Sequence, residues 1–144
     1  MAREILFKAK RLDNGEWVYG NYAFEDTKGE RHFIFQNFGF EYEVDKDTIC
    51  QYTGLTDKNG RNIFENDVIK KHFYTDYDNF CNSREFIGKV EYDDCAWCIK
   101  AKMNDYKYTH PIFMALSESH DAEYYEVIGN IFDNPELLGG ADNG

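Results

Sequence analysis

The chain has 144 residues, enough for one ordinary domain or for one domain with a small addition, and its formal net charge is -11 at pH 7. Because phosphate contacts supply most of the affinity for nucleic acids, this charge argues against direct nucleic-acid binding. Aromatic residues make up 17% of the sequence, a share that favours β-strands over helices.

The first part of the chain alternates in the manner of paired β-strands. In "REILFKAK" the apolar residues Ile5, Phe7 and Ala9 share one face, and "DNG" at residues 13–15 marks a hairpin turn before "EWVYGNYAF". A second turn signal, "DTKGE", precedes "RHFIFQNF". The acidic segment "EYEVDKDTI" follows and is a plausible crossover. These patterns predict N-terminal β-hairpins that lead into a second unit.

The most organised stretch of the chain is "QYTGLTDKNGRNIFENDVI", residues 51–69. Asp57 stands at the first position of a turn, where its carboxylate can accept hydrogen bonds from backbone amides, and Gly60 stands at the fourth, where positive φ is easy. Asn66 can adopt the left-handed conformation in a second tight turn, and a strand is predicted to begin at Asp67. We therefore expect the acids of this stretch to have structural roles.

Metal-binding patterns fit these acids poorly. Counted from Asp57 as the first position of a calcium loop, glycine falls at position four rather than six, and Val68 stands where a bidentate glutamate is required. A count from Asp76 fails in the same way. His72, Asp76 and Asp78 form a conceivable metal triad, but nothing predicts the fixed geometry that such a site needs. We expect neither a metal ion nor a cofactor.

Four cysteines, Cys50, Cys81, Cys95 and Cys98, are expected to be thiols. The segment "GKVEYDDCAWCIKAK" alternates in the manner of a hairpin strand, which would place Cys95 and Cys98 on opposite sides of that strand. A thioredoxin-type site would need the same pair at the start of a helix, and a zinc site would need two more ligands at suitable spacing. Both alternatives remain open but are disfavoured.

Three separated motifs resemble the YopX family of phage and prophage proteins: the stretch at residues 51–69, "GKVEYDDCAWCIK", and the closing "EVIGNIFDNPELL". The opening "REILFKAKRLDNGEWVYG" is similar to that of the family as well. The resemblance implies a mainly β fold with a small SH3-like barrel in its later part and no established activity. We expect N-terminal β-hairpins over residues 1–47, an SH3-like barrel over residues 48–138 and a disordered tail over residues 139–144. "NPELL" predicts a short helical turn near the C-terminus.

The long segment "HFYTDYDNFCNSREFI" is aromatic and acidic, and it is where the family varies most. Loops carry binding functions more often than cores do, so this segment is the candidate partner-binding loop, although a variable loop between barrel strands is the alternative. The residues proposed for contact are Phe73, Tyr74, Tyr77 and Phe80.

Three classes of function compete. The leading hypothesis is a non-enzymatic phage or prophage accessory protein that binds an unknown protein and assembles with itself. The second is an acidic inhibitor, or DNA mimic, of a host nucleic-acid enzyme, because no Lys or Arg follows Lys107 whereas seven acids do. An enzyme ranks last, because no nucleophile, base and orienting group can be assembled from the sequence.

The sequence also bears on location. No run approaches the 18 apolar residues of a membrane span, and the start "MAREILFKAK" lacks the apolar core of a signal peptide. We expect a soluble protein in the cytoplasm of the bacterial host, without a membrane partner.

Overall fold

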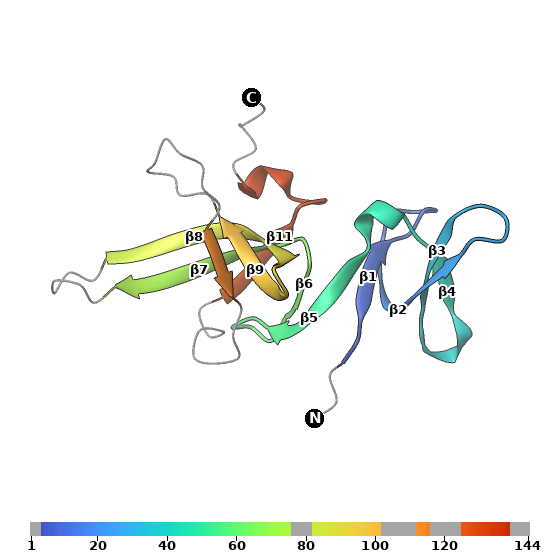
Figure 1. Ribbon diagram of the computed structural model, residues 1–144, viewed down its shortest axis with the longest axis horizontal. Helices are drawn as coiled ribbons and strands as arrows, with labels where there is room; N and C mark the ends of the chain where they lie inside the picture. The colour runs from blue at the N-terminus through green and yellow to red at the C-terminus, as the bar shows by residue number, and fades with distance from the viewer. Residues whose placement is uncertain (1–3, 76–81, 102–111, 116–124, 139–144) are drawn as a thin grey trace. The chain divides into compact units, whose positions relative to one another are not determined.

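The computed structural model describes residues 4–75, 82–101, 112–115 and 125–138, and it is mainly β (Figure 1). The predicted disordered tail at residues 139–144 lies outside these ranges. The chain divides into two compact units, Met1–Gly54 and Leu55–Gly144. The sequence-based boundary after residue 47 falls before strand β5, whereas the boundary between the two units falls within it.

Unit 1 is an antiparallel meander. Its strands are β1 (Phe7–Lys10), β2 (Trp17–Glu25), β3 (Arg31–Phe35), β4 (Glu41–Glu43) and the first part of β5 (Cys50–Thr56), with the short 3-10 helices η1 (Asn37–Gly39) and η2 (Lys46–Thr48) between them. The strand order is β4-β3-β2-β1-β5, and the sheet continues from β5 to β6. The predicted hairpins are confirmed, and Gly15 has a φ of 73° in the turn that joins β1 to β2.

The core of unit 1 lies on one face of this meander. Ala9 pairs with Val18 across β1 and β2, and both are buried with Ile34 and Val44. After β4 the chain returns to the end of β1, where Arg11 and Val44 form an isolated bridge. Two further backbone bonds, Leu12 N to Glu43 O at 3.0 Å and Asp45 N to Lys10 O at 2.8 Å, support it. The ends of β1 and β4 are therefore joined, although β2 and β3 lie between them in the sheet.

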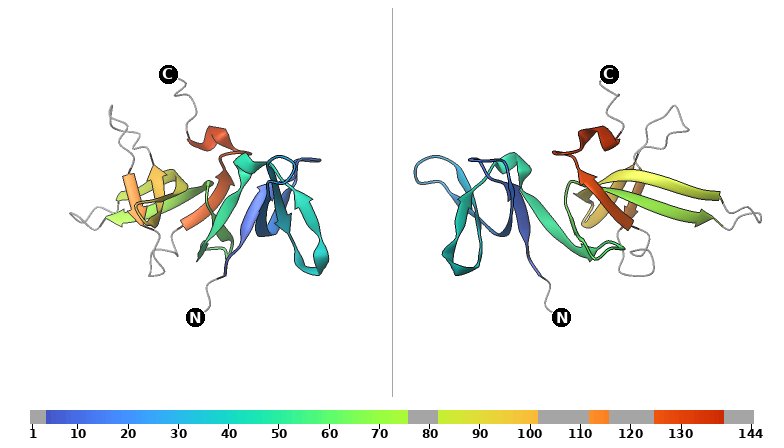
Figure 2. Two further views of the ribbon diagram at one scale, coloured as in Figure 1. Left: turned by 45° about the vertical axis from the view of Figure 1, so that its right-hand side comes forward. Right: turned by 180° about the vertical axis from the view of Figure 1, so that it is seen from behind.

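Unit 2 contains a second antiparallel sheet. The elements of this unit are β6 (Asn62–Phe64), β7 (Asp67–Thr75), β8 (Asn82–Asp93), β9 (Ala96–Ala101), β10 (Ile112–Ala115), β11 (Tyr125–Asn130) and the 3-10 helix η5 (Pro135–Leu138). β6 belongs to the first sheet. The order in the second sheet is β10-β9-β8-β7-β11. β7 and β8 pair from Val68 opposite Lys89 to Thr75 opposite Asn82, and they run as a long ribbon in Figure 1 and in the right-hand view of Figure 2.

The core of unit 2 is formed by Ile63, Ile69, Val90, Ile99 and Tyr125, which come from five different strands. Among the described residues β10 and β11 are the two edges of an open sheet, and no pairing joins them. The mainly β fold and the short helical turn near the C-terminus are thus confirmed, whereas a closed SH3-like barrel is not. Within the described ranges, no helix has the length and apolar character needed to cross a membrane.

The close approach of β2 to β3 generates the first prediction. A Cβ atom added at Gly20 would lie 2.1 Å from the carbonyl oxygen of Phe35 and 3.1 Å from Cγ2 of Ile34. Since a backbone carbonyl cannot move aside cheaply, Gly20→Ala should lower the free energy of unfolding by about 1–3 kcal/mol, measured by urea denaturation.

The matched control for this variant is the opposite exchange on the same strand, Ala23→Gly. Glycine weakens an ordinary strand position, so this control should lower the free energy of unfolding by about 0.5–1 kcal/mol. A Gly20→Ala protein as stable as the wild type would contradict the close approach of β2 and β3.

Candidate functional site

Part of the predicted partner-binding loop lies in strands. β7 extends to Thr75 and β8 begins at Asn82, so Phe73 and Tyr74 belong to a strand, opposite Arg84 and Ser83. The structure describes the backbone of these two aromatics but not their side chains, and Tyr77 and Phe80 lie outside the described residues. Their role in partner binding stays a prediction.

The Asp57 carboxylate is buried and serves the backbone. Its side chain accepts hydrogen bonds at Oδ1 from the amides of Asn59 and Arg61, both at 2.9 Å, and at Oδ2 from the amide of Val127 at 3.0 Å. The residue is 6% exposed, and Gly60 in the same turn has a φ of 78°. The predicted turn is confirmed, and both carboxylate oxygens are occupied by backbone donors.

The second turn of the same stretch follows the same principle. Asp67 is 2% exposed, and its Oδ2 accepts a hydrogen bond from the amide of Phe64 at 2.8 Å. Asn66 has a φ of 68°, its amide donates to the carbonyl of Val90, and its own carbonyl accepts from the amide of Ile131. Asp57 and Asp67 therefore hold turns, which agrees with the structural roles expected for the acids of this stretch.

The cysteine pair is not arranged as predicted. Asp94 and Cys95 form the two-residue turn between β8 and β9, with φ values of 50° and 63°, so Cys95 is an exposed turn residue rather than a strand residue. Positive φ at both central positions matches the twist of a hairpin. Cys98 is buried in β9, and burial raises the pKa of its thiol. Within the described ranges, no three His, Cys, Asp or Glu residues lie close enough to hold a metal ion.

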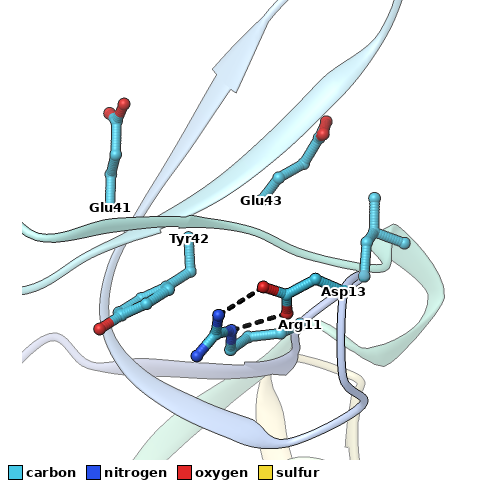
Figure 3. A pocket seen from close by; sticks show the side chains of 6 residues that line it. Arg11, Asp13, Glu41, Tyr42 and Glu43 are labelled. Carbon is cyan, nitrogen blue, oxygen red and sulfur yellow. Dashed lines mark hydrogen bonds and ion pairs between the residues drawn. The ribbon is translucent and has the colours of Figure 1, made fainter.

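A shallow hollow of about 420 Å³ lies on unit 1. Its lining is formed by Arg11, Leu12, Asp13, Glu41, Tyr42 and Glu43 (Figure 3). The Arg11 guanidinium forms a two-point ion pair with Asp13 and lies 4.5 Å from the centre of the Tyr42 ring. The hydrogen bond from Arg11 lowers the pKa of Asp13, and the same bond raises the pKa of Arg11. Arg11 and Asp13 therefore bind each other in this hollow, and Glu43 pairs with Arg31.

An exposed aromatic tip projects between β3 and β4. We define it as residues 36–40, closed by a hydrogen bond of 2.8 Å from Gln36 N to Phe40 O. Phe38 has a φ of 68° and is 98% exposed, and Phe40 is 59% exposed. Sequence reasoning missed this tip, although "NFGF" holds two aromatic residues beside a glycine.

A hydrogen-bonded chain of three side chains lies elsewhere on unit 1. The hydroxyl of Tyr22 lies 2.6 Å from Nδ1 of His32, and Nε2 of His32 lies 2.9 Å from Oε1 of Glu30. The ring of Phe24 lies 5.1 Å from that of His32. The hydrogen bond from His32 and the nearby Lys46 ammonium lower the pKa of Glu30. Only the alternation of β2 and β3 brings these residues together, and no local motif marks them.

Unit 2 buries a lysine beside a tyrosine. Lys71 is 6% exposed, and its Nζ donates to the hydroxyl of Tyr125 at 3.1 Å. The same ammonium lies 4.7 Å from the centre of the Tyr125 ring. Since Tyr125 is itself 1% exposed and belongs to the core, this pair joins β7 to β11 and is closed to a ligand.

Comparison with known proteins gives a family and a likeness to solved structures. The family model described as YopX protein matches residues 6–139. No curated protein matches the chain. The chain is similar to the crystal structure of protein EF1440 from Enterococcus faecalis, with 24% identity and a TM-score of 0.49 over 95% of this chain and 99% of that one.

The Asp57 contacts predict a large effect on stability. Asp57→Ala leaves three backbone amides without their acceptor, and each buried unsatisfied group costs about 1–3 kcal/mol, so the free energy of unfolding should fall by at least about 2 kcal/mol. The free energy of unfolding of Asp57→Asn should lie between those of the wild type and Asp57→Ala, because the asparagine amide keeps one acceptor oxygen. Urea denaturation is the measurement.

An exposed carboxylate provides the control for Asp57. Asp13→Ala removes a carboxylate whose side chain is 63% exposed, and the change should stay within about 0.5 kcal/mol. If Asp57→Ala were as mild as Asp13→Ala, the carboxylate would not be holding the turn.

The thiols should differ in reactivity. In a Cys81→Ser background, a disulfide reagent that releases a coloured thiolate should react quickly with Cys95, because it is exposed. Cys50 and Cys98 should react only after denaturant is added, because both are buried. Introducing Cys95→Ser should remove the fast phase, and a fast phase that survives this change would contradict the arrangement.

Proposed function

The chain belongs to the YopX protein family, and on that premise we propose that it is a phage or prophage accessory protein that binds another protein and catalyses no reaction. The proposed place of action is the cytoplasm of the bacterial host. The proposed contact is the aromatic tip at residues 36–40. The observation that carries the proposal is the conformation and exposure of Phe38.

Phe38 is held in an unfavourable state without burial in its own chain. A left-handed backbone costs a residue other than glycine about 1–2 kcal/mol, and bulky side chains rarely adopt it. Burying a phenylalanine side chain would contribute about 1.5–3 kcal/mol, yet this one is 98% exposed. Strained, exposed aromatic residues of this kind are typical of binding sites, where a partner supplies the missing contacts.

The surroundings of the tip indicate the chemistry of the partner. Phe40 adds a second exposed ring, and Glu41 follows it as an exposed acid at the start of β4. The whole chain carries a net charge of -11. An apolar pocket with a basic rim would therefore complement the tip, since it would bury the ring of Phe38 and attract the acidic surface around it.

Self-assembly is the form of this proposal in which the partner is a second copy. Two chains of charge -11 repel each other, so added salt should strengthen an association between copies. Added salt should instead weaken binding to a basic partner. Sedimentation and affinity measurements at two salt concentrations separate these two forms.

An acidic inhibitor that mimics DNA is the second candidate, and the net charge favours it. Of the acids that follow Lys107, Glu126 lies 3.3 Å from the Lys58 ammonium and is partly neutralised by it. Glu118, Asp121 and Glu123 lie outside the described residues. We rank mimicry second, because the strained aromatic tip has no role in it.

The test of the proposal changes the tip without harming the fold. Phe38→Asn removes the ring, and asparagine adopts positive φ readily, so the protein should stay folded but lose its partner in crosslinking and pull-down from the bacterial host. Phe38→Gly should lose the partner as well and should raise the free energy of unfolding by about 1 kcal/mol, because the strain is relieved.

The matched control is Tyr92→Asn, which removes another exposed ring, from β8 of unit 2. This variant should keep the partner. If the Phe38→Asn and wild-type proteins retained the partner equally, the tip would be refuted as the contact. If both proteins retained it at low salt and lost it at high salt, mimicry would be favoured.

A further inference from the structure

The three side chains Tyr22, His32 and Glu30 have the order of a nucleophile, a base and an orienting group. A tyrosine hydroxyl contacts an imidazole nitrogen at 2.6 Å, and the opposite ring nitrogen contacts a carboxylate at 2.9 Å. Both distances lie within the reach at which a base activates a nucleophile. Lys46 lies 3.8 Å from the second oxygen of Glu30 and holds that carboxylate near the ring.

The carboxylate determines which nitrogen of His32 carries the proton. An ionised carboxylate only accepts hydrogen bonds, and the pKa of Glu30 is lowered by its contact with His32, so Nε2 of the neutral ring donates to Oε1. Nδ1 is then an acceptor, and the Tyr22 hydroxyl donates to it. The phenol is therefore hydrogen-bonded to a base that is free to take its proton.

Two observations describe the surroundings of Tyr22. Tyr22 is 37% exposed, whereas the side chain of His32 is 12% exposed behind it. The rings of Phe7 and Phe24 stand beside it, 5.7 Å from the Tyr22 ring and 5.1 Å from the His32 ring respectively. Tyr22 is thus a partly exposed residue with an apolar border.

We propose that Tyr22 is a base-activated nucleophile and a site of covalent acylation by uncharged activated esters. This inference goes beyond protein binding and does not depend on the aromatic tip. The apolar border formed by Phe7 and Phe24 suits an uncharged acyl donor, and the Glu30 carboxylate repels anionic ones. The product is an O-acyl tyrosine on the surface of unit 1.

The step balances without an oxidant or a metal. The Tyr22 oxygen attacks the ester carbonyl while its proton passes to Nδ1 of His32, and a new carbon–oxygen bond forms. The bond from the carbonyl carbon to the leaving oxygen breaks. The departing alkoxide or phenoxide takes the proton from His32, which returns to its neutral form, with Glu30 orienting the ring throughout.

The experiment uses the full chain and p-nitrophenyl acetate as the probe. Release of nitrophenolate gives the overall rate, and peptide mapping by mass spectrometry gives the rate at each tyrosine. Tyr92 is the internal standard, because it is more exposed, at 58%, than Tyr22. At neutral pH Tyr22 should acquire the acetyl group roughly tenfold or more faster than Tyr92, since a positioned base contributes about 10²–10⁴.

Two variants separate activation from mere exposure. Tyr22→Phe should abolish acetylation at this position. His32→Gln keeps an acceptor for Tyr22 and a donor for Glu30 but is not a base in the neutral range, so it should slow acetylation of Tyr22 roughly tenfold or more. Glu25→Gln changes an exposed acid of the same strand and should leave the rate unchanged.

The pH profile provides a readout that a structural role would not change. In the wild type the acetylation of Tyr22 should already be fast below the pH at which free phenols ionise, because a positioned base takes the proton, whereas in His32→Gln it should become fast only at alkaline pH. Circular dichroism of both proteins confirms that they are folded. Equal rates at Tyr22 and Tyr92, or the same profile in both proteins, would overturn the proposal.

Discussion

The carboxylate of Asp57 joins two segments of unit 2 that lie 70 residues apart in the sequence. One of its oxygens fixes the turn that leads into β6, and the other accepts from the backbone of β11. A second bond, from the amide of Lys58 to the carbonyl of Tyr125, runs beside it at 2.9 Å. β11 in turn pairs with β7, so the core of unit 2 depends on a turn that a buried acceptor side chain completes.

Much of this architecture could be predicted because its turns are encoded locally. The glycine of "DNG", the Asp and Gly of "DKNG" and the Asn of "END" each stand where the backbone requires them, and the strands between them alternate. The role of Asp57 within its own turn could therefore be derived from spacing alone. Its bond to Val127 could not, because that contact depends on how β11 is placed.

The features that sequence reasoning missed depend on backbone conformation or strand register, which residue types alone do not specify. The alternation of "GKVEYDDCAWCIKAK" predicts a strand at Cys95, yet Asp94 and Cys95 both take positive φ there. Phe38 falls in the predicted strand-like segment "RHFIFQNF", yet its backbone is left-handed, with a φ of 68°. The contacts of Tyr22 with His32 depend on the register of β2 and β3, which residue types alone do not specify.

The pairing of β11 also matters for how the protein is made. In unit 1 each of the first four strands pairs with its neighbour in the sequence, so these contacts can form while the chain is still leaving the ribosome. The strand at one edge of the second sheet, β11, pairs with β7 across more than 50 residues, and Asp57 must wait for the same strand. Before residues 125–130 have left the ribosome, the Asp57 carboxylate lacks its bond to Val127 and β7 has an open edge. A chaperone could cover that edge until synthesis ends.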